Sequence, residues 1–229
     1  MILMKMVIKY GGSLLFKDGK INVDLIDNIC DIVRELHEKG NEIGMVIGGG
    51  FTARQYISAL NPYFAEAKKD YVAVLATRMN AMLFVSRLSD ICCPKPPAHF
   101  EDILDCLGSG KMIVSGGMQP GQSTNAVATL LCEAMGARVL VNATNVDFIY
   151  DKDPKKYKDA VPITTMDYKG LKGIISNIDS TAGGYDMFDM VAAKNIERSG
   201  IELHFINGND PENLYKIIDN VQVGTVVKG

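Results

Sequence analysis

The sequence V-I-G-G-G-F-T-A-R at residues 46–54 runs from two β-branched residues into three glycines and then into a helical pattern. Ala53, Ile57 and Leu60 follow with the spacing of one helix face, so the stretch predicts a strand that feeds a helix through a glycine turn. Backbone without Cβ atoms can approach a ligand closely, and a helix start offers unpaired N–H donors and a positive dipole end. This geometry favours a phosphate ligand. A tight connection without a ligand is the alternative that this stretch alone leaves open.

Two further glycine turns have the same layout. The predicted strand at residues 6–10 breaks at Gly11 and Gly12, and the predicted strand at 112–114 ends at Gly116 and Gly117. Strands and helices alternate along the whole chain, which argues for an α/β fold with a mainly parallel sheet covered on both faces. Ligands of such sheets gather at the carboxyl ends of the strands. The other strands are expected at 43–47, 139–141 and 202–206, and helices at 23–36, after Gly50, at 70–88, 126–135, 188–199 and 211–218.

Length and composition restrict the classes of function. The 229 residues, 47% of them hydrophobic, can bury a substantial core in one large domain or two intimate lobes. The 24 basic and 27 acidic residues leave no electrostatic footprint for nucleic acid. No apolar run is long enough to span a bilayer, and the chain start is too short for a signal peptide before the first strand. We therefore expect a cytoplasmic protein with neither a nucleic-acid nor a membrane partner.

The cysteines show no paired metal-ligand spacing and stand in apolar or helical surroundings. We predict that they are buried thiols in a reducing compartment, and we predict no metal site made by side chains. The five cysteines are Cys30, Cys92, Cys93, Cys106 and Cys132.

Several motifs occur in the order seen in the amino acid kinase superfamily. They are KYGGS at residues 9–13, GGG at 48–50, ATRMNA at 76–81, GGMQPGQST at 116–124, ATNVD at 143–147 with YDKDP at 150–154, and ERSGI at 197–201. Within that superfamily the chain resembles the archaeal-type UMP kinases over almost its whole length. The resemblance implies a single three-layer α/β/α domain over residues 1–229, whose N-terminal half holds UMP and whose C-terminal half holds ATP. It also implies a homohexamer and Mg²⁺ bound through the nucleotide phosphates.

Lys9 lies in an otherwise apolar strand, a placement that is costly for a charge without an anionic partner. A strand-end lysine whose ammonium reaches water is the alternative. By resemblance, Lys9 is catalytic and bridges the transferring phosphates, while the loop of Tyr10, Gly11, Gly12 and Ser13 also holds ATP. Phosphoryl transfer depends more on positioning and charge neutralisation than on covalent chemistry, so a lysine with convergent N–H groups suffices.

The resemblance assigns the acceptor to the glycine turn and to two later segments. Gly49 would contact the UMP phosphate, while Gly50 and Arg54 would face ATP across the same turn. Asp70, predicted at a helix start, would bind the nucleoside of UMP, and a plain charge that complements the helix dipole is the alternative. The segment that encloses UMP would be Met118, Gln119, Pro120, Gly121, Gln122, Ser123 and Thr124.

The ATP segment lies in the second half of the chain. By resemblance it contains Thr144, Asn145, Tyr150 and Asp153, where the tyrosine borders the adenine and the aspartate holds a ribose hydroxyl. Lys152 is a weaker candidate, because a lysine in a charged loop is usually solvated.

Arg78 and Asn80 are candidates to line the acceptor pocket, with a polar helix surface as the alternative for Asn80. The chain also departs from the family pattern. Asn125 stands where the superfamily usually has an aspartate that orders the catalytic lysine, and we expect Asp189 to take over this catalytic role or else merely to complement a helix dipole. Phe148 stands where glycine is common, which would reshape the adenine pocket or reflect different packing of a bulge.

Three functions remain open on the sequence. The first is UMP kinase, and the second is a related kinase acting on isopentenyl phosphate or acetylglutamate. The third is a noncatalytic nucleotide- or anion-binding module, motivated by Asn125. The segments 76–81 and 119–124 match the nucleotide-acceptor branch and favour the first.

Overall fold

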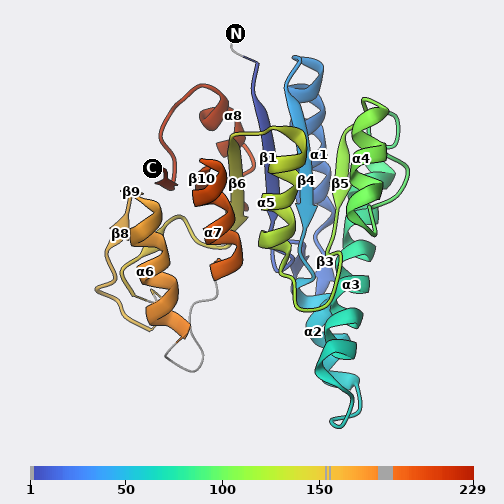
Figure 1. Ribbon diagram of the computed structural model, residues 1–229, viewed down its shortest axis with the longest axis horizontal. Coiled ribbons are helices and arrows are strands. Elements are labelled where there is room, and N and C mark those ends of the chain that lie inside the picture. Colours follow the sequence, from blue (N-terminus) through green and yellow to red (C-terminus); the bar gives the residue numbers. More distant parts are fainter. Residues whose placement is uncertain (1–2, 153, 155, 180–187) are drawn as a thin grey trace.

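The computed structural model describes residues 3–152, 154, 156–179 and 188–229. In these residues, seven strands form one sheet in the order β5-β4-β1-β6-β10-β11-β9 (Figure 1). The first five of them run parallel, β11 is antiparallel to β10, and β9 is parallel to β11. The strands are β1 (Lys5–Tyr10), β4 (Glu42–Ile47), β5 (Ile113–Ser115), β6 (Val139–Thr144), β9 (Thr165–Met166), β10 (Glu202–Asn207) and β11 (Thr225–Val227). The predicted α/β fold with a mainly parallel sheet is confirmed.

Helices cover both faces of this sheet (Figure 1). They are α1 (Val23–Glu38), α2 (Gly50–Ala59), α3 (Glu66–Arg87), α4 (Phe100–Gly108), α5 (Thr124–Met135), α6 (Tyr168–Asp179), α7 (Met190–Ser199) and α8 (Asn213–Ile218). Two small hairpins pair β2 (Phe16–Lys17) with β3 (Lys20–Ile21), and β7 (Ile149–Tyr150) with β8 (Pro162–Ile163). No helix in the described ranges has the length and apolar character needed to cross a membrane.

The alternation of side chains along β1 explains why both faces are covered. Met6, Ile8 and Tyr10 pack in one core with α1, α3 and α8, whereas Val7 packs in a second core with α4, α5, α6 and α7. Successive residues of a strand point to opposite faces, so a strand buried on both sides is apolar throughout. Lys9 therefore belongs to the face of the sheet that α5 and α7 cover.

Local signals set some helix ends and not others. The Asn22 side chain accepts from Leu25 N at 3.4 Å and begins α1, as predicted. Helix α3 begins at Glu66, four residues earlier than predicted. The sequence did not reveal this start because Ala65 provides no capping side chain. Asp70 therefore lies in the second turn of α3, and the predicted position at a helix start is wrong.

The prediction that all five cysteines are buried thiols is wrong for two of them. Cys93 and Cys106 form a disulfide with Cα atoms 6.2 Å apart, which joins the segment after α3 to helix α4. Cys30, Cys92 and Cys132 are buried free thiols, as predicted. Burial raises the pKa of Cys30 to about 12, so this thiol is unreactive near neutral pH.

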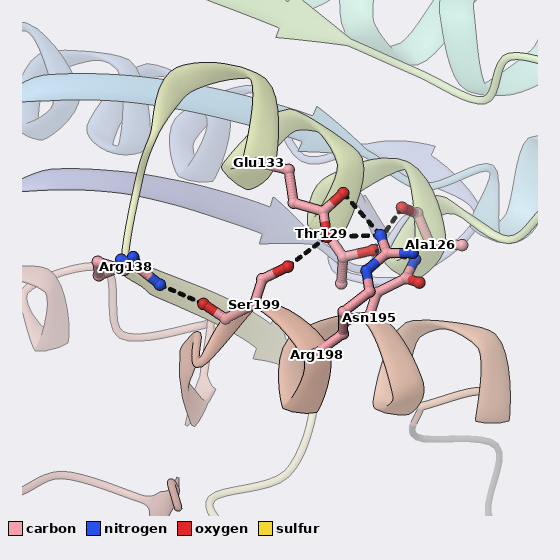
Figure 2. Close-up of polar contacts among 7 residues, drawn as sticks. All are labelled: Ala126, Thr129, Glu133, Arg138, Asn195, Arg198 and Ser199. Carbon is pink, nitrogen blue, oxygen red and sulfur yellow. Dashed lines mark hydrogen bonds and ion pairs between the residues drawn. The ribbon is translucent and has the colours of Figure 1, made fainter.

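Helices α5 and α7 run parallel to each other and are joined by side-chain contacts (Figure 2). Asn195 Nδ2 donates to Thr129 Oγ1 at 2.9 Å, and one turn further Arg198 Nη2 lies 2.6 Å from Glu133 Oε1. The Ser199 hydroxyl also donates to Glu133. Because the contacts advance together along both helices, the amino ends of α5 and α7 lie at the same end of the sheet.

Candidate functional site

Five parallel strands end at one edge of the sheet, and their following loops form the candidate site. The loops are tied to one another by backbone hydrogen bonds: Gly48 N donates to Tyr10 O at 2.9 Å, and Gly11 N donates to Ala143 O at 2.9 Å. The predicted glycine turns after β1 and β4 therefore meet, beside Thr144 at the end of β6. Such an edge is where ligands of parallel sheets bind.

The turns after β1 and β4 touch through backbone atoms. A Cβ atom on Gly12 would lie 2.4 Å from both Gly48 O and Gly50 N, and a Cβ atom on Gly50 would lie 2.0 Å from Gly12 C. Gly50 also has a positive φ of 53°, which disfavours any side chain. Close packing of two loops therefore accounts for these glycines without a ligand, and the case for a ligand rests on the space beside them.

That space is a cavity of about 440 Å³, within the usual size range of small-molecule sites. It brings together residues that are far apart in sequence, from the glycine turn, helix α3 and the loop before α5. Predicted acceptor residues in its lining are Gly49, Asp70, Gln119, Gly121, Gln122, Ser123 and Thr124, and the predicted ATP residues Gly50 and Arg54 line it as well. Met118 instead lines a neighbouring cavity of about 450 Å³, which shares Gln119 and Gln122 with the first.

Helix α3 holds the loop that follows β5. The Asp70 carboxylate accepts from Gly121 N at 3.0 Å, and Thr77 Oγ1 accepts from Gly117 N at 2.6 Å. Arg78 donates to the carbonyls of Gly117 at 3.0 Å and Met118 at 2.9 Å, and also to Ala98 O at 3.0 Å. Arg78 therefore supports the wall of this cavity from behind and is not among its lining residues, contrary to the prediction.

Asn80 was predicted either to line the cavity or to lie on a polar helix surface, and both predictions are wrong. Its side chain is 3% exposed and donates to the carbonyls of Gly48 at 2.9 Å and Gly49 at 3.0 Å. Asn80 is therefore a buried support of the glycine turn.

The amino ends of α5 and α7 meet through Ser123 and Asp189. Ser123 Oγ caps α5 by accepting from Ala126 N at 3.0 Å, and it donates to Asp189 Oδ2 at 2.5 Å. Asp189 Oδ1 caps α7 by accepting from Ala192 N at 2.9 Å. Two positive helix ends and a carboxylate thus converge at the edge of the sheet. The capping role of Asp189 is observed, and its catalytic role stays a prediction.

Lys9, the predicted catalytic lysine, and the next residue, Tyr10, lie in the central strand β1 between β4 and β6. The sheet register places Lys9 beside Val46 of β4 and Asn142 of β6, and Lys9 is partly buried. The Tyr10 side chain points to the opposite face, is fully buried and lies against Phe84 with ring centroids 6.4 Å apart. Burial raises the pKa of Tyr10. Only the backbone of Tyr10 is therefore available for the contact with ATP, which stays a prediction.

Asn125, where the superfamily usually has an aspartate, is 9% exposed. Its Oδ1 atom has no hydrogen-bond partner among the residues that the structure describes. Across the described part of the chain, no three His, Cys, Asp or Glu side chains gather in a group that could hold a metal ion.

The predicted ATP segment begins at the same edge of the sheet. Thr144 Oγ1 accepts from Val146 N at 3.3 Å and shapes the turn, and Asn145 is exposed. Tyr150 in β7 is partly buried and meets Phe148 edge-on, with ring centroids 6.4 Å apart. Asp153 lies outside the described residues. Lys152 forms an ion pair with Asp159 at 2.7 Å, as expected for a solvated loop lysine.

A mainly parallel α/β/α sandwich with a lysine, glycine turns and two helix amino ends at one edge is typical of proteins that bind phosphate groups. Within that class, the model of the Amino acid kinase family matches residues 4–207, and the chain belongs to this family.

Several uridylate kinases are similar to this chain over nearly their full length. The uridylate kinase of Methanococcus aeolicus is 39% identical over 224 residues, which cover 98% of this chain and 99% of the relative. The uridylate kinase of Methanocaldococcus jannaschii is 37% identical over 227 residues, covering 99% and 100%. The crystal structure of uridylate kinase from Archaeoglobus fulgidus superimposes with a TM-score of 0.84 at 36% identity, covering 98% of this chain and 100% of that chain.

Proposed function

We propose that the protein is a uridylate kinase that transfers the γ-phosphate of ATP to UMP, giving ADP and UDP for pyrimidine nucleotide synthesis. The full-length similarity to several uridylate kinases supports this proposal. The observation that carries it in the structure is the cavity of about 440 Å³ that joins the glycine turn to Asp70 and the loop 119–124. This cavity offers backbone donors for a phosphate at one end and polar side chains for a nucleoside at the other.

The proposed division of roles follows the arrangement of the loops. Gly49 and the amino end of α5 would receive the UMP phosphate, since both offer N–H donors beside the cavity. The turn from Gly11 to Ser13 and the segment after Thr144 would hold ATP. Lys9, on the face of the sheet covered by α5 and α7, would neutralise the transferring phosphoryl group, with Asp189 as the candidate acid that orders the cluster. The chemistry then consists of positioning and charge stabilisation.

Magnesium would enter with the nucleotide, since Mg²⁺ is commonly bound by substrate phosphates with few protein ligands. Bound there, it neutralises phosphate charge. This fits the donor set at the edge of the sheet, in which hydroxyl groups and backbone N–H groups predominate.

We also propose a cytoplasmic homo-oligomer, a hexamer by family resemblance. The apolar residues Phe84, Val85 and Leu88 at the end of α3 are buried in the core and are not available for an interface. A different stripe of α3 is apolar and exposed, and it supports an interface between copies: Tyr71 50%, Leu75 42%, Met79 57% and Met82 42%. Light scattering would give a molar mass of about 150 kDa for six copies of 25.0 kDa.

The function is tested by direct chromatography of products formed from ATP with UMP, CMP, isopentenyl phosphate or acetylglutamate. We expect UDP from UMP at the highest kcat/KM. Turnover of another acceptor in preference to UMP would identify a related kinase. Calorimetric binding of nucleotides without turnover on any acceptor would identify a noncatalytic module.

The acceptor site is tested by Asp70→Asn. This change leaves the backbone in place but removes a charged acceptor from the cavity, so the KM for UMP should rise much more than the KM for ATP. Equal effects on the two substrates would indicate that Asp70 serves the loop through Gly121 only.

A further inference from the structure

We propose that Asn80 is a positioning residue for phosphoryl transfer, whose amide fixes the peptide groups of the glycine turn so that the N–H groups of Gly49 and Gly50 face the substrates. This inference rests on the proposed function and on the assignment of these two glycines to phosphates. Among the described residues that line the acceptor cavity, Gly49 and Gly50 are present and Asn80 is not. Asn80 thus acts from behind the turn.

The Asn80 amide is fully engaged. Nδ2 donates to Gly48 O at 2.9 Å and to Gly49 O at 3.0 Å, while Oδ1 accepts from Thr52 Oγ1 at 3.2 Å. Carbonyl oxygens can only accept, so the end of the amide that faces them must be the NH₂ group. The Thr52 hydroxyl then holds the other end. Asn80 is only 3% exposed, so water has little access to the two carbonyls. Removal of its side chain therefore leaves them without this donor unless the turn changes its conformation.

Peptide geometry converts these bonds into the orientation of two donors. The structure has no cis peptide bond in its described residues, and in a planar trans peptide the N–H points opposite to the C=O. Since the carbonyls of Gly48 and Gly49 both point at Asn80, the N–H groups of Gly49 and Gly50 both point away from it. Glycine peptides rotate easily, so this orientation needs an external support.

The two peptide groups do not depend on Asn80 equally. The Gly49 carbonyl also accepts from Ala53 N at 3.3 Å, as the first bond of helix α2. The Gly48 carbonyl has no second donor among the described residues. Loss of Asn80 should therefore disturb the Gly49 N–H, on the acceptor side, more than the Gly50 N–H.

The experiment measures kcat and the KM values for UMP and ATP in Asn80→Ala. Reorienting a preorganised donor is a smaller change than deleting one, which typically costs 10²–10³ in kcat. We expect kcat/KM for UMP to fall by about tenfold or more, and kcat/KM for ATP to fall by clearly less. All variants are compared well below the lowest Tm in the set.

Asn41→Ala is the matched control. Asn41 is 1% exposed, donates to Leu36 O at 2.8 Å and accepts from Met4 N at 3.0 Å, but lies at the amino end of β4, away from the site. Asn41→Ala should lose about as much stability as Asn80→Ala, because it also removes buried hydrogen bonds. Its kcat/KM should stay within about twofold of the unaltered protein, because Asn41 does not support the site.

A variant Asn80→Ala with the kinetics of Asn41→Ala would overturn the inference, and so would equal losses for UMP and ATP. If Asn80→Ala does not fold, Thr52→Val removes only the bond to Oδ1 and should lower kcat/KM for UMP by a smaller factor; unchanged kinetics would then overturn the inference. Absence of UDP formation by the unaltered protein would instead reject the proposed function itself.

Discussion

Replacing Gly12 by alanine tests whether contact between the two glycine turns sets the geometry of the site. The added Cβ would lie 2.4 Å from Gly48 O, 2.4 Å from Gly50 N and 2.6 Å from Gly48 C, whereas ordinary van der Waals contact begins at 3.4 Å. The turns must therefore separate by about 1 Å, which is 3.4 minus 2.4. All three neighbours are backbone atoms, so no side chain can rotate away to relieve the overlap.

The expected cost has two parts. Overpacking of this kind destabilises by about 1–3 kcal/mol, which corresponds to a fall in Tm of about 2–4 °C per kcal/mol for a chain of this size. A displacement of about 1 Å between the groups that hold the reactants costs about 100-fold in rate. We therefore expect Gly12→Ala to remain folded, with kcat for UDP formation lowered by about two orders of magnitude, measured by chromatography of the nucleotides.

The control is Gly173→Ala. A Cβ at Gly173, inside α6, meets no atom within 4 Å apart from the helix's own backbone, and alanine favours a helix. This variant should keep its kcat and gain slight stability. Wild-type kcat in Gly12→Ala, or an equal loss of kcat in Gly173→Ala, would refute the reasoning.

Three other outcomes can be measured on the same protein. Lys9→Ala should lower kcat by about 100-fold or more without unfolding, because one preorganised charge is removed, and turnover close to normal would reject its catalytic role. Arg78→Lys should raise the KM for UMP by about tenfold, since a single ammonium cannot reproduce the guanidinium contacts that hold Gly117 and Met118; calorimetric titration with an unchanged UMP affinity would contradict this. Burial lowers the pKa of His204 below its value of about 6.5 in the unfolded chain. As pH falls, the unfolded state therefore binds more protons than the folded state, and the free energy of unfolding should decrease between about pH 7 and 5.5. Urea titrations should show a weaker pH dependence in His204→Gln, and an unchanged dependence would exclude this histidine as a cause.

The sequence predicted what local patterns encode. The order of strands and helices, the Asn22 cap and the three glycine turns follow from periodicity and residue type over short windows. Convergence of the turns at one edge follows from parallel strands. Helices α4 and α6 were not predicted: α4 spans nine residues after a proline-rich turn, and α6 contains Gly170 and Gly173, which weaken a helical pattern.

The sequence pattern did not predict contacts between segments that are distant in the chain. Asn80 reads as an ordinary polar helix residue, and its role depends on a turn 31 to 32 residues away. The Cys93–Cys106 bond likewise depends on how α4 folds back toward the end of α3. Three polar residues, at 77, 78 and 80, follow closely on one another in a helix that also carries apolar core residues, and this was the available signal, since polar side chains are buried only with partners.

The central place of β1 in the sheet has a consequence for synthesis of the chain. This strand pairs on one side with β4 and on the other with β6, which begins at Val139, 129 residues after Tyr10 (139 minus 10). At ribosomal rates of about 5–20 residues per second, roughly 6–26 s pass before that second partner exists. During this interval one edge of an apolar strand has no partner, and unpaired apolar edges recruit other chains. Until β6 is made, this edge of β1 is therefore a site at which the nascent chain can associate with other chains.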